Sequence, residues 1–77
     1  MARTYEHRQP LLKEEKIRIA LFDLTGREVE ILKEEVMKPG WYHEVFRLKK
    51  GRPANGIYFL LFKSEEETRS EKLIFKE

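Results

Sequence analysis

The chain has 77 residues, 39% of them charged, and a net charge of only +2. A single domain of this length buries only about 60% of the surface that its unfolded chain exposes, so we expect no deep catalytic cleft. Positive and negative residues are interspersed along the chain, so the charge requires neither a nucleic acid nor an acidic membrane as partner.

One clear strand pattern lies in the first part of the chain. It runs from Ile17 to Phe22, where apolar residues at every second position share one face of an extended chain. Residues 3–8 make a poor strand on their own, and Gln9-Pro10 is expected to break it.

A tight turn follows at Asp23-Leu-Thr-Gly26. A short carboxylate can bond backbone N–H groups two residues on, and glycine takes the positive φ that a tight reversal often requires. Asp23 is the only aspartate in the chain, which indicates that the shorter side chain serves the turn. We therefore expect Asp23 to cap the turn and Gly26 to adopt a positive φ.

Residues 27–38 fit two patterns. Apolar residues from Val29 to Met37 have the spacing of an amphipathic helix, which Pro39-Gly40 would end. The apolar alternation that begins at Val29, directly after the turn, instead predicts a strand. We favour the strand, with residues 33–35 as an exposed link.

Residues 41–48 alternate cleanly, but the buried face is ambiguous. One face carries Tyr42, Glu44, Phe46 and Leu48, and the other carries Trp41, His43, Val45 and Arg47. Either face can be the buried one, so the register of this strand and the burial of Trp41 are open at this point.

The last third of the chain predicts a loop and two strands. Residues 49–56 have the composition of a loop, with Asn55-Gly56 as a turn signal. Residues 57–63 form a continuous apolar run, which predicts a central strand covered on both faces. Residues 68–75 alternate weakly and predict the last strand.

These elements predict an all-β fold, a small antiparallel Ig-like β-sandwich of six or seven strands, formed as one domain over residues 1–77. We expect Leu21, Tyr58 and Leu60 in its core, because they lie in the two strands with the strongest apolar patterns. The abundance of Lys and Glu is typical of heat-adapted proteins, so we also expect a thermostable domain.

The residues offer little chemistry. The chain lacks cysteine, and its two histidines lie far apart in the sequence. A Ser-His-Asp arrangement would need Asp23, which the turn already uses, and the glutamate pairs lie in predicted exposed turns. The four glycines form no phosphate-binding motif. We expect no enzyme, no metal site and no cofactor.

Three stretches resemble a known family in the same order. Leu21–Val29 is similar to V-Y-D-x-x-G-R-x-V, the signature of the C-terminal sorting domain of bacterial type IX secretion cargo, which also occurs in a related Ig-like module of the flagellar hook-capping protein. Gly51–Phe59 resembles G-R-x-x-x-S/N-G-x-Y-F, and Lys72–Lys76 resembles the closing K-h-h-h-x-K. The turn and structural positions of the motif are then Asp23, Gly26, Arg27, Gly40, Asn55, Gly56 and Tyr58.

The resemblance implies an opening strand at residues 3–8 and a hairpin that pairs residues 27–38 with Ile17–Phe22. It also implies the C-terminal domain of a larger exported protein, which directs its cargo through an outer-membrane translocon. The cargo would pass the periplasm and reach the cell surface or the medium. The implied partners are translocon proteins and an upstream cargo domain in the same chain, with no nucleic acid and no membrane insertion. We expect a monomer or a weak edge-strand dimer. The residues expected to meet the translocon are Lys72, Leu73, Ile74, Phe75 and Lys76.

The sequence is also compatible with two other functions. The first is a generic Ig-like interaction or spacer module of a surface protein, in which Leu73 and Phe75 complete the core and the flanking lysines protect an edge strand. The second is a small β-barrel that binds single-stranded nucleic acid by stacking and charge. The residues for that function would be Lys49, Lys50, Arg52, Trp41, Tyr42 and Phe46.

Overall fold

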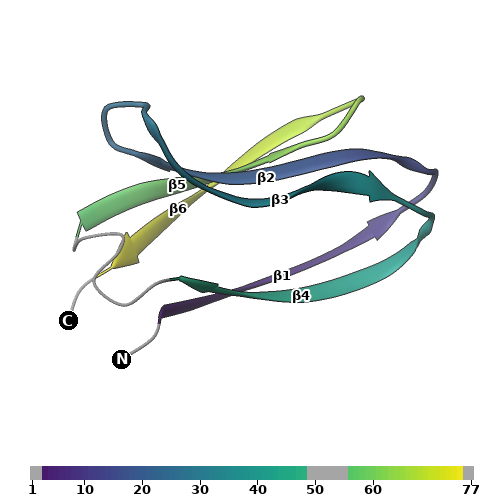
Figure 1. Ribbon diagram of the computed structural model, residues 1–77, viewed down its shortest axis with the longest axis horizontal. Helices are drawn as coiled ribbons and strands as arrows, with labels where there is room; N and C mark the ends of the chain where they lie inside the picture. Colours follow the sequence, from purple (N-terminus) through teal and green to yellow (C-terminus); the bar gives the residue numbers. More distant parts are fainter. Residues whose placement is uncertain (1–2, 49–55, 76–77) are drawn as a thin grey trace.

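The computed structural model describes residues 3–48 and 56–75, which fold into six antiparallel strands and contain no helix. This confirms the predicted all-β sandwich (Figure 1), and of the predicted six or seven strands the described residues form six. The strands are β1 (Arg3–Leu11), β2 (Glu15–Asp23), β3 (Glu28–Met37), β4 (Gly40–Leu48), β5 (Gly56–Lys63) and β6 (Thr68–Phe75). The Ig-like topology stays a prediction.

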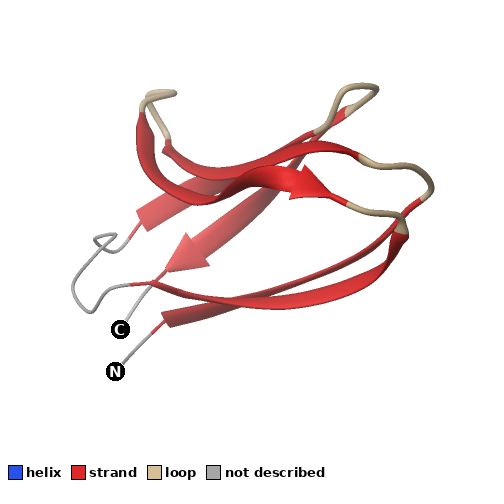
Figure 2. Ribbon diagram, turned by 45° about the vertical axis from the view of Figure 1, so that its right-hand side comes forward, coloured by secondary structure: helices blue, strands red, loops and turns tan. Residues whose placement is uncertain are grey.

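The strands form two layers of unequal size (Figure 2). One sheet holds only β1 and β4, and the other has the order β3-β2-β5-β6. β1 lies over β5 and β6, since the ring of His7 stacks on Phe62 at 5.4 Å and Arg69 reaches Gln9. β4 lies over the β3 side, where Lys33 and Glu44 form an ion pair. The smaller sheet therefore covers one face of the larger one.

The core lies between the two sheets. Leu21 is fully buried, and Tyr58 and Leu60 are only 8% and 2% exposed, as predicted. Each fully buried leucine contributes about 1.5–3 kcal/mol through removal of apolar surface from water. The buried cluster comprises Leu11, Ile17, Ile19, Leu21, Met37, Tyr58, Leu60 and Phe62.

β3 is one continuous strand, which confirms the strand over the helix and shows that the exposed link at residues 33–35 was wrong. Lys33 pairs with Ile19, and its side chain is only 17% exposed. Two register shifts in the pairing with β2 leave Leu32 and Val29 as extra residues on β3. Each extra residue reverses the side-chain alternation, so the sequence of β3 lacks the period of a regular strand.

β1 continues through Gln9-Pro10 to Leu11, so the predicted break there was wrong. Among the described strands, β1 forms a backbone ladder only with β4. A proline is tolerated in such an edge strand, where its missing N–H can face the unpaired side.

The buried face of β4 carries Tyr42, Glu44 and Phe46, which are half-buried, while Trp41 points outward and is 69% exposed. The register is set by the pairing with β1, in which His7 stands opposite Glu44. A glutamate therefore occupies an inward position, and its ion pair with Lys33 makes this possible.

β5 is the central strand that the sequence predicts, because it pairs with both β2 and β6. The expectation that both of its faces are covered was wrong. Tyr58, Leu60 and Phe62 lie under the smaller sheet, whereas Phe59 and Leu61 on the opposite face are only half-buried.

Candidate functional site

The turn between β2 and β3 is held by one carboxylate. Asp23 Oδ1 accepts hydrogen bonds from Thr25 N at 2.9 Å, Thr25 Oγ1 at 2.6 Å and Arg27 N at 3.0 Å. Gly26 has a φ of +90° and donates its N–H to the Asp23 carbonyl at 3.0 Å. Both predictions for the turn are confirmed.

The charge of Asp23 is stabilised by the same contacts. The hydrogen bond from the Thr25 hydroxyl, followed by the one from the Arg27 backbone, lowers the pKa of Asp23 below its ordinary value. Arg27 Nε lies 3.5 Å from Asp23 Oδ2, but its side chain is 80% exposed. The geometry of the turn therefore depends on the Thr25 hydroxyl and the backbone N–H groups more than on this ion pair.

β4 and β5 begin with the same arrangement of glycine and tyrosine. A Cβ atom at Gly40 would lie 3.8 Å from the ring of Tyr42, and one at Gly56 would lie 3.8 Å from the ring of Tyr58. Each tyrosine ring thus packs beside the glycine two residues before it. Gly40, Gly56 and Tyr58 were expected as structural positions; the sequence analysis missed Tyr42, although the repeated G-x-Y spacing marks it. Asn55 lies outside the described residues.

The last strand, β6, is one edge of the four-stranded sheet. It pairs with β5 from Phe75 opposite Gly56 to Thr68 opposite Lys63 without a register shift. No other described strand borders its free side. β6 ends at the same end of the sandwich at which β1 begins (Figure 1).

The expected recognition residues point to both sides of β6. Leu73 and Phe75 face the core, and the ring of Phe75 lies 5.4 Å from that of Tyr58. Lys72 is exposed, and Ile74 is 61% exposed. Lys76 lies outside the described residues. The structure therefore gives Leu73 and Phe75 a packing role and leaves Lys72 and Ile74 accessible to a partner.

Polar side chains fasten β6 to β1, a feature that the sequence analysis missed. Tyr5 donates a hydrogen bond to Glu71, and Arg69 Nη2 donates to Gln9 Oε1 at 3.1 Å. Burial, and then the bond to Glu71, raise the pKa of Tyr5. Residue spacing gives no signal for these contacts, because the partners are sixty residues or more apart.

The opposite side of the sandwich is fastened by Lys33 on β3 and Glu44 on β4. Burial opposes the charge of Lys33, but its hydrogen bonds to Glu44 and Glu35 outweigh burial and raise its pKa. Both long sides of the apolar core are thus closed by polar pairs.

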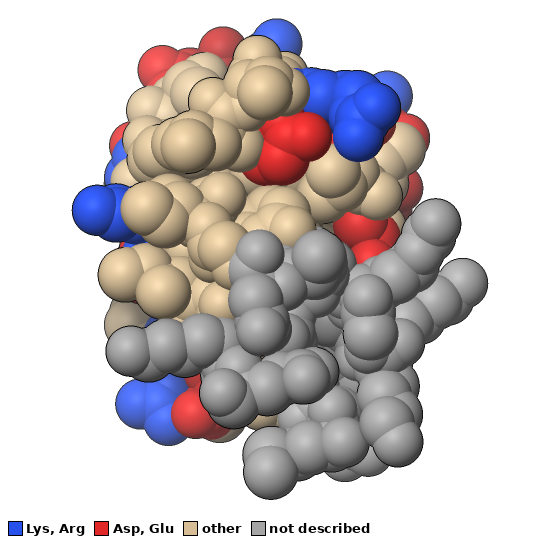
Figure 3. Space-filling model, turned by 90° about the vertical axis from the view of Figure 1, so that its left-hand side faces the viewer, with Lys and Arg blue, Asp and Glu red and all other residues tan. Residues whose placement is uncertain are grey.

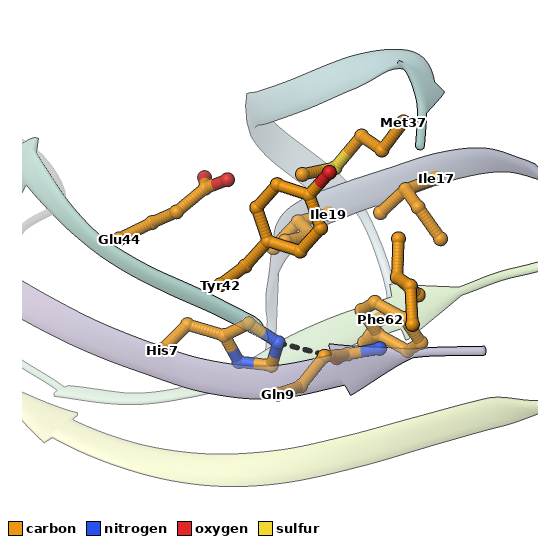
Figure 4. Close-up of a pocket in the computed structure, with 9 residues that line it drawn as sticks. His7, Gln9, Ile17, Ile19, Met37, Tyr42, Glu44 and Phe62 are labelled. Carbon is orange, nitrogen blue, oxygen red and sulfur yellow. Dashed lines mark hydrogen bonds between the residues drawn. The ribbon is translucent and has the colours of Figure 1, made fainter. Parts of the chain in front are cut away.

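A small cavity lies between the layers, but it is no ligand site. Side chains of β1 and β4 face those of β2, β3 and β5 across it, and His7 Nε2 lies 2.6 Å from Gln9 Oε1 (Figure 4). Its volume of about 10 Å³ is about the room for one water molecule. In residues 3–48 and 56–75 no group of three His, Asp or Glu could hold a metal ion, and no helix is long and apolar enough to cross a membrane.

The three aromatic residues proposed for stacking nucleic acid do not share one face of β4. Tyr42 and Phe46 pack against the core, while Trp41 lies on the other side of β4. Lys49, Lys50 and Arg52 lie outside the described residues. Figure 3 looks at one end of the sandwich, and there the positive and negative side chains of the described residues are intermingled. The packing of Tyr42 and Phe46 against the core removes two of the three aromatic residues on which that function depended.

Comparison with known families gives one result. Residues 9–76 match the family described as the secretion system C-terminal sorting domain. The match includes the Asp23 turn and the whole of β6. None of the curated proteins and none of the solved structures that we compared matches the chain.

Proposed function

Since the chain belongs to the family of secretion system C-terminal sorting domains, we propose that it addresses an exported cargo protein to an outer-membrane translocon and that the translocon reads β6. The family makes it a sorting signal for type IX secretion. In our proposal the cargo crosses the periplasm and reaches the cell surface or the medium, and the domain itself is no catalyst. The observation that carries the proposal is the match over residues 9–76.

The geometry of β6 supports recognition at this strand. Its free edge offers backbone N–H and C=O groups to an added strand, and main-chain bonds of this kind give affinity without large side-chain contacts. The two edges of the four-stranded sheet differ, because β3 has two register shifts and β6 has none. A regular ladder is the better template for a partner strand.

The side chains of β6 support a division of roles. Leu73 and Phe75 hold the strand on the core, so the partner need not unfold the domain to reach it. Lys72 and Ile74 are exposed and would select the partner. The packing residues keep the strand in place, and the exposed residues on the other face are available for recognition.

An export experiment tests the proposal. Residues 1–77 are placed behind a signal peptide and a fluorescent cargo in a bacterium that has the type IX machinery. We expect the fusion to reach the surface or the medium. The variant with both Lys72→Gln and Lys76→Gln should be folded and retained in the periplasm.

The matched control carries Lys16→Gln and Lys63→Gln, which remove the same charge from exposed positions of β2 and β5. We expect this control to be exported. If the intact, folded fusion stays in the periplasm, the sorting role for that machinery is wrong and a generic interaction module becomes the better function. If both lysine pairs affect export equally, net charge rather than β6 is read.

A further inference from the structure

The four-stranded sheet has an outer face, the side turned away from β1 and β4, that no described residue covers. Ile31 and Ile74 on this face are 47% and 61% exposed, and the larger aromatic side chains are half-buried. Contiguous exposed apolar area of this kind marks interaction surfaces. The apolar members of the outer face are Ala20, Phe22, Ile31, Val36, Ile57, Phe59, Leu61 and Ile74.

The strand pairing orders this face into rows. Residues that stand opposite each other in adjacent antiparallel strands project to the same side of the sheet. One row across β3, β2, β5 and β6 is Ile31, Ala20, Leu61 and Ser70. The next row is Glu28, Phe22, Phe59 and Lys72. This second row has an acid at one end, two aromatic residues in the middle and a base at the other end.

The charges on the outer face are separated in the same direction. On the β3 side, Arg18 lies 2.7 Å from Glu28 and 2.9 Å from Glu34, so this group of three has one negative charge left over. On the β5 and β6 side, Lys63 and Lys72 form no ion pair with a described residue. Lys16 on β2, further along the same face, is also exposed and offsets that charge. The acids of the face therefore lie on the β3 edge, whereas the β5 and β6 half is positive.

We propose that a second copy of this chain packs on the outer face, related by a two-fold axis that runs parallel to the strands between β2 and β5. Rotation about this axis places β3 over β6 of the other copy and β2 over β5. Every row then meets itself in reverse order. A two-fold interface requires such a self-complementary surface.

The rotation matches the chemistry of the rows. Glu28 stands opposite Lys72 of the other copy, and Phe22 stands opposite Phe59. In the neighbouring row the small Ala20 stands opposite Leu61, which favours interdigitation of the two layers. Arg18 stands opposite Lys63, but the two carboxylates bound to Arg18 leave that group negative. A partner of another kind would have to supply this pattern from outside, whereas a second copy contains it.

The expected association is weak. Four strands about 4.8 Å apart and roughly four rows of residues give a face of about 500 Å² per copy. Stable interfaces bury about 800 Å² per partner. We therefore expect monomers at low micromolar concentration and dimers as the concentration rises towards the millimolar range. This inference does not depend on the sorting role.

Sedimentation equilibrium of the 77-residue chain tests the proposal. We expect a concentration-dependent dimer that Leu61→Lys weakens by about a hundredfold, because a charge is then buried opposite Ala20. Lys72→Glu, which changes only an exposed side chain, should weaken the dimer by about tenfold through repulsion from Glu28. Trp41→Lys is the matched control on the two-stranded sheet, where Trp41 is 69% exposed, and it should leave the dimer unchanged.

Cross-linking tests the orientation. The chain has no cysteine, so Glu28→Cys and Lys72→Cys each introduce a single thiol. A bismaleimide about 10 Å long, the spacing of packed sheets, should link a mixture of the two variants more efficiently than either variant alone. Preferential linking within one variant would overturn the proposed axis.

Several results would overturn the proposal as a whole. A chain that stays monomeric up to the millimolar range would rule out the second copy. The outer face would then be left to another partner, such as a cargo domain or a translocon surface, or would stay uncovered. A dimer that survives both Leu61→Lys and Lys72→Glu, or that Trp41→Lys abolishes, would place the contact elsewhere.

Discussion

Both faces of the four-stranded sheet carry large apolar side chains, but their surroundings differ. On the inner face Ile19, Leu21 and Leu60 are at most 2% exposed. On the outer face Phe22, Phe59 and Leu61 alternate with them along the same strands and are only half-buried. The difference arises because β1 and β4 cover one face only. Apolar character in a strand thus shows that a face can be covered, and not what covers it.

The largest expected effect separates the two faces directly. Leu21→Ala should lower the free energy of unfolding by about 2–5 kcal/mol, because its cavity is enclosed on all sides. Leu61→Ala, the same deletion on the outer face, should cost about 1 kcal/mol when the chain is monomeric. Urea unfolding at low micromolar concentration measures both. Equal losses would mean that the faces do not differ in the way the structure indicates.

The turn after β2 provides a reference that belongs to neither face. Gly26→Val should cost about 2 kcal/mol, because a β-branched residue resists a φ of +90°. No atom lies within 4 Å of a Cβ built at Gly26, so the loss reflects backbone strain and not a clash. Gly26→Asn should lose much less, since asparagine tolerates positive φ. Thermal unfolding of the two variants gives the comparison; similar losses would point to another cause.

The ion pairs of the two faces should also differ. Glu44→Gln leaves Lys33 without its main partner at a position where both side chains are less than 20% exposed, and should cost about 1–2 kcal/mol. Glu34→Gln removes an acid from the more exposed group around Arg18 and should cost about 0.5 kcal/mol or less. Chemical unfolding at pH 7 measures both losses. A larger loss for Glu34→Gln would reverse the comparison.

The smallest expected effect is the loss of stability at alkaline pH. In the folded protein the pKa of Tyr5 is raised from its ordinary 10.0 and that of Lys33 from 10.5. The folded state therefore keeps protons that the unfolded chain releases, and stability is full below about pH 10 and falls as the pH rises further. Both residues close the inner layer, so the loss reports on that layer.

Tyr5→Phe tests this assignment because it has no phenolic proton to release. Thermal unfolding between pH 8 and pH 11, in steps chosen around the ordinary Tyr5 pKa of 10.0, should show a shallower alkaline decline for the variant than for the parent chain. An unchanged decline would mean that Tyr5 does not titrate differently in the two states.

Local chemistry determined how much of the molecule could be predicted from the sequence. Asp23 and Gly26 were placed correctly because the turn depends on contacts within five residues. Residues 33–35 were misplaced because two extra residues on β3 hide its period. The inward position of Glu44 could not be chosen, since its partner Lys33 lies on another sheet.

The same reasoning applies to β6 and its surroundings. The terminal position of Leu73 and Phe75 and their apolar character predicted a last strand, which the structure confirms. The bonds from Tyr5 to Glu71 and from Arg69 to Gln9 could not be foreseen, because they depend on how one layer is laid over the other. Sequence patterns specify strands and turns, whereas the contacts between layers follow from the assembled fold.

The two register shifts on β3 also limit how far the four-stranded sheet can be extended. If a second copy added to β6, edge against edge, each molecule would use its one regular edge in the contact. The edges left at the two ends of the enlarged sheet would both be β3, whose shifts make a poor template for another strand. Growth by this route would stop at two molecules, so the fold can offer a strand to a partner with little risk of forming a fibre.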